Sequence, residues 1–181
     1  MRTFVTTLIL GSALLLAAPA PAAAQGTFGA GLSFLHDGDA ENTATGVTLD
    51  FFQGLDDREA VTLGWVGDLS WHPDNDQHLF SLMGGARVLG DTNPNFDWFG
   101  QFLLGFMRSS AAGDAGELCD ALDIDCDDTG FAFGPGFGVD VPINERVNVR
   151  GQVDFLWFAR EGDTSAAQRF WVGVSLPVGG D

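Results

Sequence analysis

The feature that most constrains this chain is an alternation of bulky apolar residues with small or polar ones. Side chains of an extended strand point alternately to opposite faces, so a period of two predicts β-strands with one apolar and one polar face. A helix would repeat its apolar residues every three or four positions instead. The alternation can be followed in eight runs, at residues 27–35, 43–53, 59–72, 78–89, 96–108, 130–142, 146–160 and 168–178.

The sixth run shows the two faces most clearly. Bulky side chains occupy one set of alternate positions, and glycine, alanine or aspartate occupies the other. The third, fourth and seventh runs divide in the same way, whereas the fifth, at 96–108, is apolar at both sets of positions and its faces stay unassigned. In the sixth run the bulky set is Phe131, Phe133, Pro135, Phe137, Val139 and Val141, and the small set is Ala132, Gly134, Gly136, Gly138 and Asp140.

The segments between the runs alternate in length. Segments after odd-numbered runs include the long, acidic one at Ser109–Thr129, and segments after even-numbered runs are short throughout. In a barrel whose antiparallel strands follow chain order, alternate connections lie at the same end, so this pattern predicts one elaborate rim and one plain rim. The longer connections are expected at His36–Asn42, Pro73–Gln77, Ser109–Thr129 and Glu161–Ala167, and the short ones at Gly54–Arg58, Gly90–Asn95 and Ile143–Glu145.

Two kinds of barrel share this alternation and differ in which face points outward. A soluble barrel such as a lipocalin keeps its apolar face inside, whereas a membrane barrel turns that face toward lipid. Here the small face carries few charges, and the bulky face is too large to fill the inside of eight strands. Trp71, Trp98 and Trp157 lie near run ends, where membrane barrels form aromatic belts. The prediction is an all-β, eight-stranded antiparallel up-and-down transmembrane β-barrel, with a soluble periplasmic lipocalin-like binding barrel as the alternative.

The N-terminus has the pattern of a secretory signal peptide. Arg2 precedes the mostly apolar stretch 4–16, and the small residues Ala22–Ala24 precede Gln25. We therefore expect a signal peptide at residues 1–24 and one barrel domain at residues 25–181. The formal net charge of −17, with 25 acidic and 8 basic residues, excludes a nucleic-acid-binding role because phosphate binding needs a basic surface.

Together these features resemble a known family. The signal peptide, the eight runs and segments such as Gly134-Pro135-Gly136-Phe137-Gly138-Val139-Asp140 are similar to those of the eight-stranded outer-membrane β-barrels, among them the outer membrane protein A transmembrane domain and related small barrels. The resemblance covers the whole of 25–181. It implies the outer membrane of a Gram-negative-type bacterium, with membrane lipid, lipopolysaccharide and the outer-membrane assembly machinery as partners. Most members are not enzymes, so it implies a structural or surface-interaction role. The chain departs from the family at Leu176–Asp181, which lacks the usual terminal aromatic residue.

Charged residues on the small face are the candidate functional residues. A buried unpaired charge is costly, so Arg87 and Arg150 are each expected to pair with an inward aspartate of another strand. Two arginines for four aspartates leave an acidic excess. We interpret the set as a plug that holds the barrel closed, because side chains just fill an eight-stranded interior; a narrow cation-preferring conduit is the alternative. The predicted lumen network is Asp50, Asp68, Arg87, Asp140, Arg150 and Asp154.

The long connection between the fifth and sixth runs holds the chain's two cysteines. Export exposes them to an oxidising compartment, so a Cys119–Cys126 disulfide is expected. The spacing of Asp123, Asp125 and Asp127 is similar to that of a calcium loop, but the glycine and glutamate that such a loop needs at its sixth and twelfth positions are missing. We therefore assign no metal site and no cofactor, and expect a solvated acidic rim at which a divalent cation could bind.

Asp68, Ser70 and His72 share one face of the third run and raise the alternative of a lipid-modifying outer-membrane enzyme. Same-face neighbours on one strand lie roughly 7 Å apart, which is too far for a Ser–His–Asp relay. No catalytic residue is therefore assigned, and the protein is expected not to be an enzyme.

Overall fold

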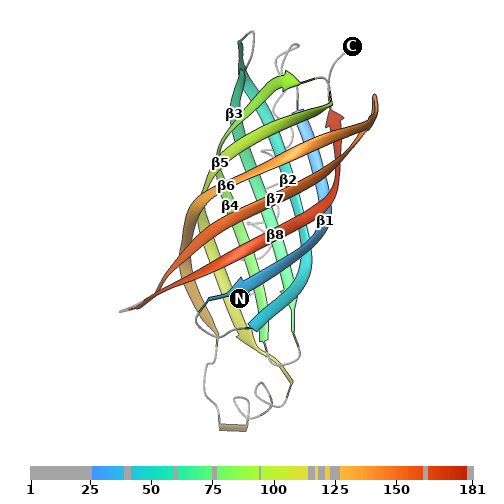
Figure 1. Cartoon of the computed structure of the whole chain (residues 1–181). Helices are drawn as coiled ribbons and strands as arrows, with labels where there is room; N and C mark the ends of the chain where they lie inside the picture. Colours follow the sequence, from blue (N-terminus) through green and yellow to red (C-terminus); the bar gives the residue numbers. More distant parts are fainter. Residues whose placement is uncertain are drawn as a thin grey trace, which may run out of the picture.

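The computed structural model of the chain describes residues 26–38, 42–58, 61–74, 77–93, 95–113, 117, 121–122, 127–160 and 163–178. Eight strands form a closed barrel (Figure 1), each paired antiparallel with its neighbours in chain order, and the last strand pairs with the first. The predicted fold class is confirmed. The expected signal peptide, 1–24, lies outside the described residues. The strands are β1 (Gly26–Asp37), β2 (Asn42–Arg58), β3 (Val61–Pro73), β4 (Gln77–Asn93), β5 (Phe96–Ala111), β6 (Asp128–Asn144), β7 (Val147–Arg160) and β8 (Asp163–Val178).

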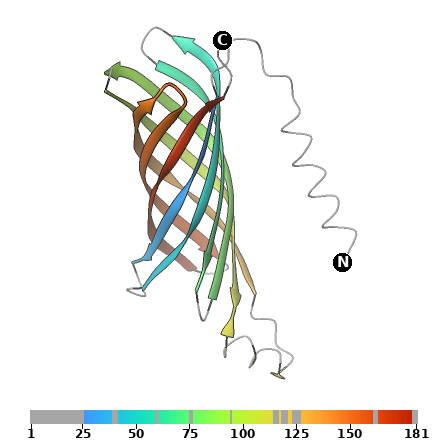
Figure 2. The same cartoon turned by 90° about the vertical axis from the view of Figure 1, so that its right-hand side faces the viewer.

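The two ends of the barrel differ less than the sequence predicted. We call the end at which β1, β3, β5 and β7 finish the loop end, and the opposite end, where β8 finishes, the turn end (Figure 2). At the loop end the connections span 38–41, 74–76, 112–127 and 161–162, and at the turn end they span 59–60, 94–95 and 145–146. The third loop-end connection is long and the turn end is plain, as predicted, but the other three loop-end connections are shorter than predicted. The strands continue past the apolar alternation, because ladder hydrogen bonds hold polar residues extended as well as apolar ones.

The bulky face of every strand points outward. The alternate outward positions of β6 and β7, such as Phe137, Val139 and Phe155, are exposed on the outer surface, while Asp140, Arg150 and Asp154 are buried inside. This orientation is that of a transmembrane barrel and the reverse of a soluble one. The ambiguous fifth run is resolved by the same rule: its outward residues are Trp98, Phe102, Leu104 and Phe106, and its inward residues are Phe99, Gln101, Leu103, Gly105 and Met107.

The interior is bulkier than predicted, because several large side chains share it with the small ones. Phe99 is buried against Gly138, where an added Cβ would lie 2.4 Å from the phenylalanine ring. Phe52 is buried against Gly64 in the same way, at 2.6 Å. Glycines on one strand thus make room for rings from another, so large and small residues alternate across the barrel.

Aromatic side chains gather near both ends of the outer surface. Trp71 and Trp157 lie near the loop end, and Trp98 lies near the turn end; all three are on the outer face. Phe133 stacks on Trp157 with ring centroids 6.0 Å apart. This distribution matches the belts that anchor barrels at the two membrane–water interfaces. Among the residues that the structure describes, no helix is both long and apolar enough to cross a membrane.

Candidate functional site

All six residues predicted to line the lumen lie on the inner face, and each is at most 2% exposed. The centre of the group is Asp50 on β2, which accepts two bonds from Nη1 of Arg150, at 2.8 and 2.9 Å. Its Oδ2 also accepts from Nη2 of Arg87 on β4. One carboxylate from β2 therefore holds guanidinium groups from two other strands.

Arg150 extends the group across the barrel to β6 and β8. Its Nε donates to Oδ1 of Asp140 at 2.7 Å and its Nη2 to Oδ2 at 2.5 Å. Such a two-point contact fixes both the distance and the plane of the pair. Asp140 also accepts from Ser175 Oγ at 3.1 Å, and Arg150 Nη2 lies 3.4 Å from Thr27 Oγ1 on β1.

Gln101 on β5 joins this group to a second one. Its Oε1 accepts from Nε and Nη2 of Arg87 at 2.9 and 2.6 Å, and its Nε2 donates to Oδ1 of Asp154 at 2.8 Å. Asp154 also accepts from Nε2 of Gln152. A neutral amide therefore links an arginine to an aspartate without adding charge.

The second group depends on Arg169, a residue that the sequence reasoning missed. Its Nη1 and Nη2 donate to the two oxygens of Asp68 at 2.7 and 2.8 Å, and its Nε and Nη2 donate to Oδ2 of Asp154 at 3.0 and 2.8 Å. The signal was present, because Arg169 and Ser175 alternate with the strictly apolar Phe170, Val172, Val174 and Leu176.

Arg169 corrects the predicted charge balance. Three buried arginines, not two, face the four aspartates, so the formal excess is one negative charge. The third arginine is needed because Asp50 and Asp68 are direct partners across β2 and β3, and like charges in opposite positions are destabilising. Arg87 and Arg150 pair with Asp50, and Arg169 pairs with Asp68.

Phe99 packs against both arginines of the first group. The guanidinium carbons of Arg87 and Arg150 are 4.4 and 4.8 Å from its ring centroid. Both distances are within the range of cation–π attraction. The ring therefore attracts both cations in addition to their pairing with Asp50. Among the described residues, Arg87 Nη1, Gln152 Oε1 and Thr48 Oγ1 are buried without a hydrogen-bond partner.

Comparison with known proteins identifies the fold. No family model and no curated protein matches the sequence. Among solved structures, Neisserial surface protein A matches with a TM-score of 0.57 and 15% identity, covering 86% of this chain and 96% of that one. Ail, the attachment invasion locus protein of Yersinia pestis, matches with a TM-score of 0.57 and 10% identity, over 86% of this chain and 97% of that one. Ail in complex with the heparin analogue sucrose octasulfate has the same coverage and identity, with a TM-score of 0.52.

The chain has the fold of the eight-stranded outer-membrane β-barrels. The resemblance drawn from the sequence is thus shown for the fold. At 10–15% identity it carries no residue role, and the side chains of this barrel must be interpreted from their own contacts.

In this outer-membrane-type barrel, the suspected catalytic residues contact other side chains rather than one another, and Asp68 and Ser70 share one partner, Arg169. His72 Nε2 lies 2.8 Å from Ser33 Oγ on β1, and Ser70 Oγ lies 2.6 Å from Ser81 Oγ on β4. Asp68 is held by Arg169. His72 makes no hydrogen bond to Ser70 or Asp68 in the described structure, so the three are not arranged as a relay. Ser33 and His72 are both buried on the inner face of the barrel.

The acidic rim is described only in part. Asp127 pairs with Arg108, and Asp128 lies 3.2 Å from Arg160; all four side chains are well exposed. Cys119, Cys126, Asp123 and Asp125 lie outside the described residues, so the disulfide stays a prediction. Within the described ranges, no group of three or more His, Cys, Asp or Glu side chains is arranged to hold a metal ion.

Proposed function

We propose that this protein is an integral outer-membrane barrel, exported with loss of residues 1–24, whose lumen is closed by the arginine–aspartate network and whose loop end interacts with the cell's surroundings. The observation that carries the proposal is the combination of an apolar outer surface with an interior in which each buried arginine and aspartate of the network has an ion-pair partner. The first makes the barrel a membrane protein, and the second makes it a poor channel.

The outer surface argues against the soluble alternative. Thirty large apolar side chains are exposed on the described part of the chain, far more than the scattered few on a soluble monomer. All of them except Leu122 lie on the eight strands, which have 12–17 residues each, enough for the roughly 9–11 residues that cross a bilayer. A lipocalin-like barrel would instead put these residues around its ligand.

The interior argues against a conduit. The network takes side chains from every strand, through Thr27 on β1 and Ser175 on β8 at its edges. An ion passing through would have to break bonds of 2.5–3.0 Å between groups that are almost completely buried. Breaking a buried pair costs roughly 3–5 kcal/mol, and several pairs block the path.

The proposed partners follow from the surface. Membrane lipid contacts the outer face, and the outer-membrane assembly machinery inserts the barrel. Lipopolysaccharide and the acidic rim carry charge of the same sign, so we expect divalent cations to bridge them. The role is structural or surface-interacting rather than enzymatic, in keeping with the separate partners of Ser70 and His72.

Two measurements test the proposal. In cells, the protein should sediment with outer membranes and resist extraction by high salt and alkaline pH; recovery in the soluble periplasm would end the membrane proposal. In planar lipid bilayers, the purified barrel should give no conductance steps, with insertion checked by its protease resistance in vesicles. Cation-selective steps from the wild-type barrel would show instead that the lumen conducts.

A further inference from the structure

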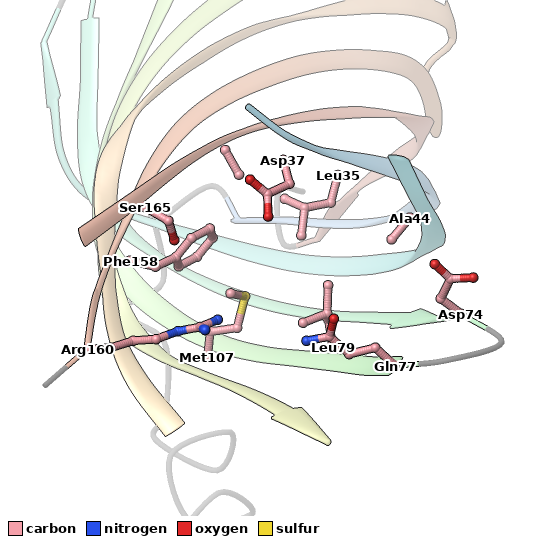
Figure 3. Close-up of a pocket in the computed structure, with 11 residues that line it drawn as sticks. Leu35, Asp37, Ala44, Asp74, Gln77, Leu79, Met107, Phe158, Arg160 and Ser165 are labelled. Carbon is pink, nitrogen blue, oxygen red and sulfur yellow. The ribbon is translucent and has the colours of Figure 1, made fainter. Parts of the chain in front are cut away.

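A cavity of about 100 Å³ opens at the loop end of the barrel, separate from the network (Figure 3). Seven of the eight strands, or residues adjoining them, contribute to its wall. Figure 3 shows apolar side chains of Met107, Phe158 and Leu79 pointing into a common space. The lining residues are Leu35, Asp37, Ala44, Asp74, Gln77, Leu79, Met107, Phe158, Arg160, Ser165 and Ala167.

The floor of this mouth cavity is apolar. Leu35, Met107, Phe158 and Ala167 are buried members of one hydrophobic cluster, and Leu79 packs against it. The same cluster continues inward through Leu103 and other residues, so the cavity has an apolar bottom and does not open into the charged network. A molecule that enters from outside is therefore held at the mouth rather than passed on.

The rim of the mouth cavity is polar and mainly acidic. Among the described lining residues, Asp37 and Asp74 lie on this rim together with one cation, Arg160, which lies 3.2 Å from Asp128. Asp37 and Asp74 also have polar interactions of their own, but their charge acts on anything that approaches the mouth. The chain's net charge of −17 adds a field of the same sign, which concentrates cations and repels anions.

The volume limits what can enter. Apolar cavities of roughly 150 Å³ admit benzene, so this smaller cavity suits a chain of about three to four carbons. A neutral apolar molecule would gain binding free energy only from its contact with the apolar floor. A molecule with a cationic head and an apolar chain would gain binding free energy from both the apolar floor and the acidic rim.

We propose that the mouth cavity is a binding site for small organic cations, primary or substituted ammonium ions that carry a short alkyl group. The alkyl group enters between Leu35, Met107 and Phe158, and the ammonium head stays at the level of Asp37 and Asp74. This site goes beyond the proposed function and does not depend on whether the lumen is closed.

Methionine methyl NMR tests the site directly. Met107 lines the cavity, whereas Met83 is buried and is not part of the lining, so one labelled barrel in lipid nanodiscs carries both a reporter and an internal reference. The probes are n-butylammonium, 1-butanol and butyrate, which share a four-carbon chain and differ in charge. We expect butylammonium to shift the Met107 signal saturably, butanol to do so more weakly, and butyrate to have no effect.

Variants separate charge from volume. Asp37→Asn with Asp74→Asn should weaken butylammonium binding by about fivefold, the order expected for two partly exposed charges, and leave butanol binding within about twofold. Glu145→Gln removes one charge at the turn end and should change neither the butylammonium affinity nor the butanol affinity. Ala167→Phe should fill the cavity and abolish the binding of both butylammonium and butanol. An unchanged Met83 signal would show that this variant is folded. If it misfolds, Ala44→Phe tests the same point.

Several outcomes would overturn the site. They are butyrate binding as tightly as butylammonium, an unchanged butylammonium affinity in the double asparagine variant, or no saturable Met107 shift with any probe. Each is independent of the conductance measurement, so the mouth cavity and the closed lumen can fail separately.

Discussion

Neutralising Asp50 is the sharpest test of the network, because this one carboxylate serves two arginines. In Asp50→Asn, the side chain keeps its shape but loses its charge, and Arg87 loses the carboxylate with which it pairs in the described structure. Arg150 keeps Asp140. The first group, neutral with Arg87, Arg150, Asp50 and Asp140, would then carry one buried positive charge.

The expected cost follows from burial. Removing one partner of a buried ion pair costs roughly 3–5 kcal/mol, and the asparagine oxygen still accepts one bond, so we expect about 3 kcal/mol of lost stability. Asp128→Asn is the matched control, because its pair with Arg160 is 3.2 Å long and both side chains are more than a third exposed. Such a pair contributes less than about 1 kcal/mol.

Urea titration of the barrel in phospholipid vesicles measures the difference, with tryptophan fluorescence and unheated gel mobility as independent signals of folding. Combining Asp50→Asn with Arg87→Met removes the unpaired cation and should restore part of the loss, because replacing both partners of a buried pair is often nearly neutral. The pairing does not stabilise the barrel as argued if Asp50→Asn lowers the unfolding free energy no more than Asp128→Asn does. The same holds if the losses of stability from Asp50→Asn and Arg87→Met simply add in the double variant.

Three further predictions concern packing, the long loop and the rim. Gly138→Ala should cost roughly 1–3 kcal/mol in the same titration, because its Cβ would lie 2.4 Å from the Phe99 ring, whereas Gly100→Ala, with nothing within 4 Å, should cost less than about 0.5 kcal/mol. Cys119→Ser with Cys126→Ser should speed proteolysis of the 112–127 connection and leave the heat-resistant barrel intact; loss of barrel assembly would contradict this. Heparin-agarose should not retain this acidic barrel at physiological salt, and specific retention would show that the −17 charge does not dominate its rim.

The sequence predicted the strands and their faces because both depend on a local pattern. Period-two alternation assigned an inward position to Asp50, Asp140 and Asp154 before any contact was known. This inference suits a membrane barrel, because the lipid-facing surface is apolar and polar residues at alternate positions therefore face inward. The ends of the strands were less predictable, because ladder hydrogen bonds extend β2, β4 and β8 past the apolar pattern.

The pairing inside the barrel could not be predicted, because it depends on geometry that no local pattern contains. Arg150 and Asp50 are 100 residues apart and meet only when the strands have the right tilt and stagger. Arg169 was missed for a different reason, since the inward face of its run was never assigned. The bulk of Phe99 was unexpected because the glycine that accommodates it, Gly138, lies on the neighbouring strand.

The order of residues along the inner faces leads to a final prediction. On β5, Gln101 of the network is followed toward the loop end by Leu103 and Met107; on β7, Asp154 is followed by Leu156 and Phe158.

On these two strands apolar side chains of one cluster therefore lie between the ion pairs and the mouth, while β1, β3 and β4 carry the buried pairs Ser33–His72 and Ser70–Ser81 at this end. We propose that the lumen is closed twice, by charge pairing and by packing. Asp50→Asn loosens only the first closure, so it should lower stability without opening a conduction path. Bilayer recordings of Asp50→Asn should stay silent under conditions in which the variant is folded. Because an ion still has to cross the packed side chains around Leu103 and Leu156, where its transfer from water is strongly unfavourable, conductance steps in this variant would mean that the ion pairs alone close the barrel.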